Sequence, residues 1–173
     1  MQSSGMRQLD NKYSFDADAT NWIVSIARGH PFYVHLVGKQ ALLRAISLGT
    51  NTVTQVIAEE ALADIALKGS APIQETTYQK AIGNSYVRET ILKQFAKQAN
   101  DEIYTTDIYA TLARELQIDG SSVSVYVGQL ASEKYGSVLN KTRERHYQFA
   151  DSLFKAYAAA RPYVRSKGDL EED

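Results

Sequence analysis

Apolar residues in the second half of the chain recur about every four positions in three separate stretches. This spacing is typical of a helix that buries one face. Three helices are therefore expected between residues 86 and 135, the first of them from Tyr86 to Gln98. The predicted buried stripes are Val87, Ile91 and Phe95 in the first helix, Ile108, Leu112 and Leu116 in the second, and Val123, Val127 and Leu130 in the third.

Polar residues mark where each of these helices should begin, because a side-chain oxygen there accepts from backbone N–H groups left unpaired at a helix start. A turn at Asp119-Gly120-Ser121 separates the second helix from the third. The expected first residues are Asn84 or Ser85 for the first helix, Thr106 with Asp107 for the second, and Ser121 or Ser122 for the third.

Three short β-prone stretches complete this region. Ile103-Tyr104-Thr105 lies between the first two helices, and Ser137–Asn140 and His146–Phe149 are expected to pair as a hairpin across the charged turn Lys141–Arg145. The resulting order is helix, strand, helix, helix and two strands. This is the order of a winged helix, in which the hairpin is the wing.

The first half of the chain reads as helical. Gly29 fits the left-handed residue that ends a helix, and Pro31 fits the first turn of the next one. The helices expected outside the winged helix run over residues 16–28, 31–48, 54–67, 74–82 and 152–161, with Thr52 or Thr54 capping the third of these and Asp151 or Ser152 the last.

The predicted fold class is therefore mostly α: a helical lid-like bundle followed by a winged-helix (helix-turn-helix) domain with a small β-hairpin wing. Lys68–Pro72 has the composition of a linker. The expected domains are a flexible N-terminus over residues 1–14, the bundle over 15–72, the winged helix over 73–165 and a disordered acidic tail over 166–173.

The amino-acid composition bears on the chemistry, the location and the charge of the protein. The chain of 173 residues has no cysteine, which excludes disulfides, thiolate metal sites and cysteine nucleophiles. It shows no signal peptide and no apolar run near the length that spans a bilayer, so we expect a cytoplasmic protein with no membrane partner. Net charge is −1, and residues 75–165 carry 12 Lys and Arg against 10 Asp and Glu, a weak basic excess.

Catalytic patterns are missing from the sequence. There is no G-x-x-x-x-G-K-[ST] string for nucleotide phosphates and no G-x-S-x-G nucleophile turn. His30, His35 and His146 lie in different elements, without partners at metal-ligand spacing. We therefore expect no enzyme activity, no metal and no cofactor in this chain.

Several short motifs resemble the C-terminal region of archaeal-type AAA+/STAND P-loop ATPases, in which a helical lid is followed by a winged helix. The resemblance covers nearly the whole chain, and it implies a lid and winged helix without the nucleotide-hydrolysing core, either as a fragment or as a standalone module. ATP or ADP would then belong to a full-length parent. The matching stretches are Phe15-Asp16, Ala27–Tyr33, Leu36, Ile91-Leu92, Tyr126–Leu130, Gly136–Leu139 and Tyr147–Tyr157.

The resemblance assigns Gly29, His30 and Pro31 to the family's G-x-P motif. It implies that Pro31 packs near an adenine and that His30 lies near a phosphate, with the missing core supplying most contacts. Phe32 stands where the family often has its sensor arginine. The alternative is a tight corner between two helices with no nucleotide role.

The winged-helix interpretation also predicts a DNA-binding surface. Residues of the third helix would meet base edges in the major groove, and cations of the wing would meet phosphates. The alternative is a winged helix that contacts another protein or the ATPase core. A continuous stripe of Lys93, Lys97, Lys134 and the wing cations would favour DNA; acidic residues that interrupt it would favour protein contact. The candidate DNA-binding residues are Ser122, Val125, Tyr126, Gln129, Lys141, Arg143 and Arg145.

Overall fold

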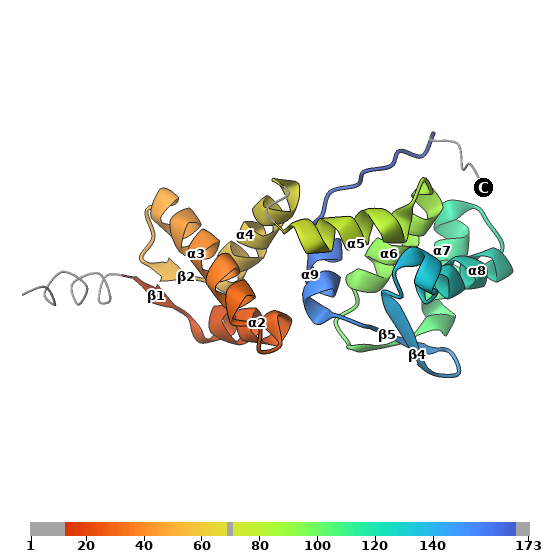
Figure 1. Cartoon of the computed structure of the whole chain (residues 1–173), viewed down its shortest axis with the longest axis horizontal. Coiled ribbons are helices and arrows are strands. Elements are labelled where there is room, and N and C mark those ends of the chain that lie inside the picture. Colours follow the sequence, from red (N-terminus) through yellow and green to blue (C-terminus); the bar gives the residue numbers. More distant parts are fainter. Residues whose placement is uncertain (1–12, 69–70, 169–173) are drawn as a thin grey trace, which may run out of the picture. The chain divides into compact units, whose positions relative to one another are not determined.

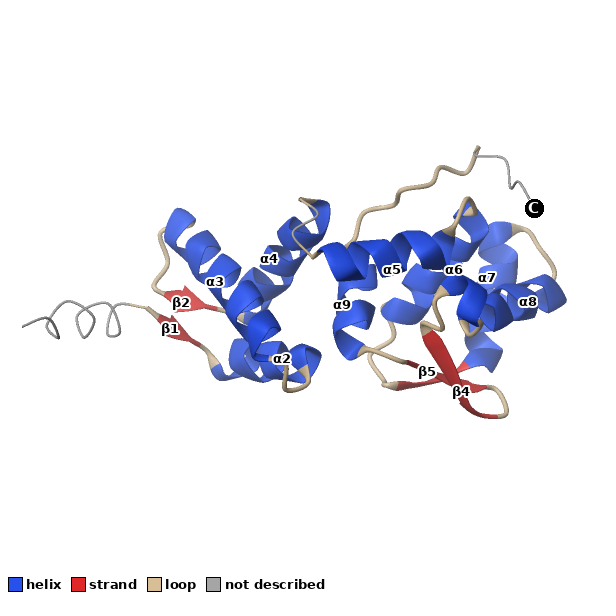
Figure 2. Cartoon of the chain, viewed as in Figure 1, coloured by secondary structure: helices blue, strands red, loops and turns tan. Residues whose placement is uncertain are grey.

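The computed structural model describes residues 13–68 and 71–168 and consists mostly of helices with small sheets (Figures 1 and 2). The chain divides into two compact units at Ser70 and Ala71, inside the predicted linker. The predictions for residues 1–12, 69–70 and 169–173, including most of the flexible N-terminus and of the acidic tail, lie outside the described residues.

Over the residues described, 13–68, the first unit packs three helices beside a minimal parallel sheet, in which Ser14 lies opposite Thr52. Its core is rich in alanine, with Ala41 and Ala45 of one helix and Ala58 and Ala61 of the next fully buried. Small side chains allow close approach of the helix backbones. The elements are β1 Ser14–Phe15, α2 Ala17–Ala27, α3 Pro31–Ser47, β2 Thr52–Val53 and α4 Gln55–Leu67.

The helix starts of this unit follow local chemistry. Asp16 caps α2 by accepting from the N–H of Ala19, and Thr54 caps α4 by accepting from the N–H of Ile57. The prediction that Thr52 caps α4 is wrong, since Thr52 lies in β2. Arg44 of α3 joins Glu60 and Asp64 of α4 through two ion pairs of 2.8 Å, which hold the two helices side by side.

The second unit contains five helices and a three-stranded sheet among its described residues. The antiparallel sheet has the order β3-β5-β4, so that the last strand of the chain lies in the middle. The elements are α5 Pro72–Ile82, α6 Tyr86–Ala96, β3 Glu102–Tyr104, α7 Thr105–Leu116, α8 Gly120–Leu130, β4 Leu139–Arg143, β5 His146–Phe149 and α9 Ser152–Ala160, with a 3-10 turn over Glu133–Tyr135.

The predicted apolar stripes form the core of this unit. Ile91, Phe95, Leu112 and the three predicted residues of α8 are fully buried, whereas Ile108 and Leu116 are only half-buried. α7 ends in its own left-handed residue, Gln117, before a short turn leads to α8. The apolar stripes therefore predicted the positions of the helices correctly. Ile108 and Leu116, at the two ends of the α7 stripe, are less buried than predicted.

Several predicted boundaries differ from the structure, and three of them concern α7 and α8. The cap of α8 is Asp119, whose carboxylate accepts from the N–H of Ser122 at 2.7 Å. α7 begins at Thr105, ahead of Thr106, because Thr105 bonds to the hairpin. α8 ends at Leu130, where a separate 3-10 turn takes over before Gly136.

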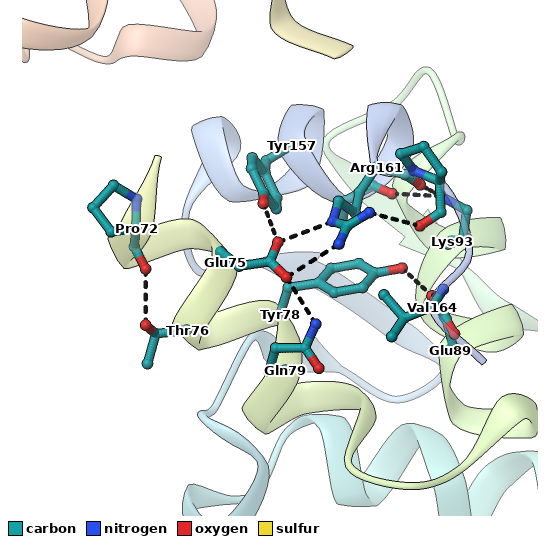
Figure 3. A network of polar contacts seen from close by, with 12 residues as sticks. Pro72, Glu75, Thr76, Tyr78, Gln79, Glu89, Lys93, Tyr157, Arg161 and Val164 are labelled. Carbon is teal, nitrogen blue, oxygen red and sulfur yellow. Dashed lines mark hydrogen bonds and ion pairs between the residues drawn. The ribbon is translucent and has the colours of Figure 1, made fainter. Parts of the chain in front are cut away.

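A buried polar network holds the C-terminal segment against α5 and α6 (Figure 3). Glu89 is fully buried, and its carboxylate accepts from the Tyr78 hydroxyl and from the backbone N–H groups of Val164 and Arg165, each at 2.7 Å. The Arg165 guanidinium in turn donates to the carbonyl of Gly83, just beyond the end of α5. Residues after α9 are thus an integral part of this unit.

A second carboxylate joins α5 to α9. Glu75 accepts from Arg161, from the Tyr157 hydroxyl and from the Gln79 amide (Figure 3). Burial alone would raise the pKa of Glu75, but the hydrogen bonds from Arg161, Tyr157 and Gln79 outweigh it and lower this pKa to about 2. Glu75 is therefore charged throughout the physiological range.

Candidate nucleic-acid interface

The third predicted helix of the DNA-binding face, α8, presents a small and uncharged outer surface. Val123, Val127 and Leu130 face inward, which leaves Val125 pointing outward with 60% of its surface exposed. The other candidates on this helix, Ser122, Tyr126 and Gln129, are half-buried at its edges. Of the four α8 candidates, only Val125 lies fully on the exposed face.

Gln129 is occupied by a contact inside the protein. Its side-chain oxygen accepts from the Arg88 guanidinium at 2.6 Å, and the same guanidinium donates to the carbonyls of Ala81 and Ile82 at the end of α5. Bidentate pairing of a glutamine with adenine needs both its oxygen and its amide nitrogen. Such pairing would require Gln129 to leave Arg88, which is itself only 7% exposed.

Tyr126 belongs to the same cluster. The Arg88 guanidinium lies 4.0 Å from the ring centre of Tyr135 and 5.9 Å from that of Tyr126. A cation over an aromatic face is stabilised when it is shielded from water. Tyr126 and Gln129 thus help to hold Arg88, a role that the sequence pattern did not reveal.

The hairpin differs from its prediction in where it turns. Lys141 and Arg143 are strand residues of β4, and only Glu144 and Arg145 form the turn. Arg145 adopts a left-handed backbone with φ of 59°. The strand register shifts between Lys141 and Arg143, which places the turn one residue later than a regular hairpin would.

Arg143 is paired with an acidic residue of the neighbouring β3 region. Its guanidinium lies 3.0 Å from the carboxylate of Glu102, which also accepts from the Thr142 hydroxyl at 2.7 Å. The hydrogen bond from Thr142 and the adjacent Arg143 guanidinium lower the pKa of Glu102. The positive charge of Arg143 is therefore largely balanced in this structure.

The turn of the hairpin is held to the start of α7. Thr105 is buried, and both its backbone N–H and its hydroxyl donate to the carbonyl of Arg145, at 2.9 and 3.2 Å. Hydrogen bonds with Thr106 and with the Arg145 side chain lower the pKa of the Tyr104 hydroxyl. Arg145 also lies 3.9 Å from Glu144, the longest of the ion-pair distances at the hairpin.

A shallow polar groove lies between the start of α7, α8 and the hairpin. Its two cations are Lys141 and Arg145, and Glu144 opposes them. No side chain caps the first turn of α7, and helix N-termini favour anions. The groove is lined by Thr105, Thr106, Tyr109, Ser124, Lys141, Glu144, Arg145 and Tyr147.

Hydroxyl groups form the floor of this groove. Burial raises the pKa of Tyr109, whose hydroxyl forms hydrogen bonds with Ser124, Thr105 and Tyr147. Ser124 is exposed on α8, so the outer face of that helix continues into the groove. The combination of hydroxyls and cations suits phosphate oxygens, which accept hydrogen bonds from both.

The continuous basic stripe is not present. Lys93 is buried and donates to the backbone carbonyls of Ala158 and Arg161 at the end of α9. Burial lowers the pKa of Lys93 to about 8. Lys97 and Lys134 are exposed, but Lys93 is buried and Arg143 is paired with Glu102, so the predicted cations do not form one continuous free stripe.

The Gly29-His30-Pro31 stretch forms the corner between α2 and α3. Arg28 and Gly29 both have positive φ, His30 is the extended residue before α3, and Pro31 is its first residue. The N–H of His30 donates to the carbonyl of Ala27 at 2.9 Å, which closes the corner. This geometry accounts for the motif without a ligand, and a nucleotide contact at His30 and Pro31 stays a prediction.

Two further observations bear on the class of site. Among the described residues, no group of three or more histidine or acidic side chains is placed to hold a metal ion. Within the same ranges, no helix combines the length and the apolar character needed to cross a membrane.

No protein-family model, curated protein or solved structure matches this chain.

Proposed function

We propose that the second unit is a winged helix that binds double-stranded DNA weakly through its phosphates, and that the chain is the lid and winged-helix portion of a P-loop ATPase without its hydrolytic core. The observation that carries the DNA-binding proposal is the groove in which Lys141 and Arg145 lie beside the uncapped start of α7. ATP or ADP would be bound by a full-length parent.

The arrangement of the second unit supports the winged-helix assignment. α6, β3, α7 and α8 are followed by a hairpin, and the sheet order β3-β5-β4 places that hairpin against the strand between the first two helices. In winged helices the third helix and the hairpin meet DNA together. The groove lies between these same two elements.

The charge of the groove sets the expected strength of binding. Phosphate contacts dominate affinity for DNA, and each contributes about −0.9 to the slope of log affinity against log salt. Two cations, opposed in part by Glu144, therefore predict weak binding with little preference for sequence. Val125 is the exposed residue of α8 best placed to touch a thymine methyl group.

The test is fluorescence anisotropy of a labelled duplex at about 50 and about 200 mM salt, where two phosphate contacts predict about a tenfold loss of affinity. Lys141→Ala/Arg145→Ala should weaken binding at low salt and remove most of this salt dependence. Lys80→Ala/Lys167→Ala is the matched control, because both lysines are exposed and neither lines the groove. Absence of binding at the lower salt would reject the DNA proposal.

A second candidate function is docking onto an ATPase core or another protein without DNA binding. Large apolar side chains are exposed in the first unit, among them Val56 at 61% and Phe32 at 67%. Exposed apolar surface of this kind marks interaction sites. This candidate gains if the duplex does not bind while Val56→Ser/Leu67→Ser lowers the tendency of the chain to associate, measured by light scattering.

A further inference from the structure

The three cations of the hairpin differ in their surroundings. Lys141 and Arg145 line the groove, whereas the Arg143 guanidinium lies against Glu102. Arg143 has 66% of its side chain exposed even in this pair. The exposed position of Arg143 would therefore suit a phosphate contact, but its ion pair with Glu102 opposes such a contact.

Glu102 is well oriented to hold Arg143. One carboxylate oxygen accepts from the Thr142 hydroxyl at 2.7 Å, and the other accepts from the guanidinium at 3.0 Å. The pair bridges β3 and β4, the two outer strands of the sheet, which are separated by β5. The Glu102 carboxylate is thus fixed by one partner while it binds the other.

An exposed ion pair of this kind is weak enough to exchange. Surface salt bridges contribute little to stability, and Glu102 has 41% of its side chain exposed. A phosphate competes with the carboxylate for the same donor groups, and arginine binds both in the same forked geometry. Pairing with Glu102 therefore lowers affinity for DNA without preventing Arg143 from moving.

We propose that Glu102 is an electrostatic restraint on DNA binding: it holds Arg143 in the unbound protein and must release it before the hairpin makes its third phosphate contact. This inference rests on the proposed DNA binding of the second unit. It assigns Glu102, the first residue of β3, a role in setting affinity through its ion pair with Arg143.

Glu102→Gln tests the restraint directly. Glutamine keeps an oxygen that accepts from Thr142, but it lacks the charge that holds Arg143. We expect roughly fivefold tighter binding at about 50 mM salt, with a salt slope steeper by about 0.9, the contribution of one phosphate contact. Because Glu102 is exposed, the variant should fold as the parent does.

Glu144→Gln is the matched control. It removes the same charge from the same hairpin, yet Glu144 lies 3.9 Å from Arg145 and makes no ion pair with Arg143. Its effect on affinity should be smaller and independent of Arg143. Because Glu144 opposes the groove cations, any gain from Glu144→Gln should survive Arg143→Ala, and a Glu102→Gln gain that also survives Arg143→Ala would overturn the proposal.

Arg143→Ala completes a double-mutant cycle. In the parent it should change affinity by less than about twofold, and in Glu102→Gln it should remove the whole gain, since coupling of this kind reports a direct interaction. Additive effects would overturn the proposal. DNA binding by the parent with no gain from Glu102→Gln would reject the restraint alone, and no binding by any variant would reject the proposed function with it.

Discussion

At the scale of single residues, side chains at the ends of elements decide where those elements begin. Asp119 caps α8 through the N–H of Ser122, although two serines in the following positions are equally good caps by type. The carboxylate is the stronger acceptor, and the serine hydroxyls bond to it in turn. The start of α8, and with it the side chains that α8 presents, depends on Asp119.

Asp119→Ala should therefore destabilise the second unit by about 1 kcal/mol, the usual cost of losing a cap. Urea unfolding followed by circular dichroism measures it. Ser122→Ala is the control, because it keeps the backbone N–H that Asp119 accepts from and loses only the hydroxyl contact, so its cost should be smaller. A larger loss from Ser122→Ala than from Asp119→Ala would show that the serine is the cap.

The backbone at Arg145 gives a second residue-scale prediction. A left-handed φ of 59° costs about 1–2 kcal/mol in a residue other than glycine. Arg145→Gly should therefore be more stable than Arg145→Ala by about 1 kcal/mol, although both variants lack the guanidinium and should lose DNA affinity equally. Unfolding midpoints of the two variants measure the effect of backbone strain on stability. Fluorescence anisotropy of the same two proteins measures the effect of the lost charge on DNA affinity.

At the scale of elements, the apolar spacing predicted the helices and strands well. It did not predict the polar contacts between them. His146–Phe149 is a strand over the predicted residues, and Asp16 and Ser85 cap helices as expected. These features depend on neighbours in sequence. The boundary between the two compact units falls at Ser70 and Ala71, inside the stretch predicted to be a linker.

The contacts that define the candidate site connect residues far apart in the chain. Arg88 and Gln129 are separated by 41 positions, as are Arg143 and Glu102. No periodicity links such pairs, so the sequence pointed to Gln129 by its helix face and to Arg143 by its place in the hairpin, without revealing that Arg88 and Glu102 hold them. Whether the candidate residues bind DNA stays a prediction.

The contact between α5 and α9 predicts how acid affects the second unit. Glu75 has a pKa of about 2, below its ordinary value, so it stabilises the fold above pH 4.5 and loses that contribution as pH falls toward 2. The shift corresponds to roughly 3 kcal/mol at most, since the side chain is 24% exposed. Glu75→Gln should lower stability at pH 7 and flatten its dependence on pH between 4.5 and 2.

Unfolding midpoints at pH 7, 4 and 3 provide the measurement. Glu60→Gln is the matched control, since Glu60 also pairs with an arginine but has 47% of its side chain exposed. Its loss should be under about 1 kcal/mol. A Glu75→Gln curve parallel to that of the parent protein would contradict the assignment.

At the scale of the whole molecule, the chain divides into two compact units, and two optical probes together distinguish their unfolding. Trp22 is the single tryptophan and lies in α2 of the first unit. Its fluorescence therefore reports the first unit, whereas circular dichroism reports both. Two compact units joined by a short linker are expected to unfold as separate cooperative transitions.

Glu89→Ala tests this separation. Removal of a fully buried carboxylate leaves three donors without their acceptor, which should cost about 3 kcal/mol or more. The transition seen by circular dichroism should move to lower urea, and the Trp22 transition should stay in place. An equal shift of both would show that the two units unfold together.

The hydrogen bonds from Thr105 to the Arg145 carbonyl also bear on the thermodynamics of association. Fixing the backbone of a flexible residue costs about 1–2 kcal/mol in conformational entropy. At the hairpin turn the backbone is already ordered in the folded, unbound protein, so binding does not add this cost. A partner that reaches the hairpin meets a preformed surface and has little to order. The backbone at the turn is thus set before any encounter, and the change on binding is left to side chains such as Arg143.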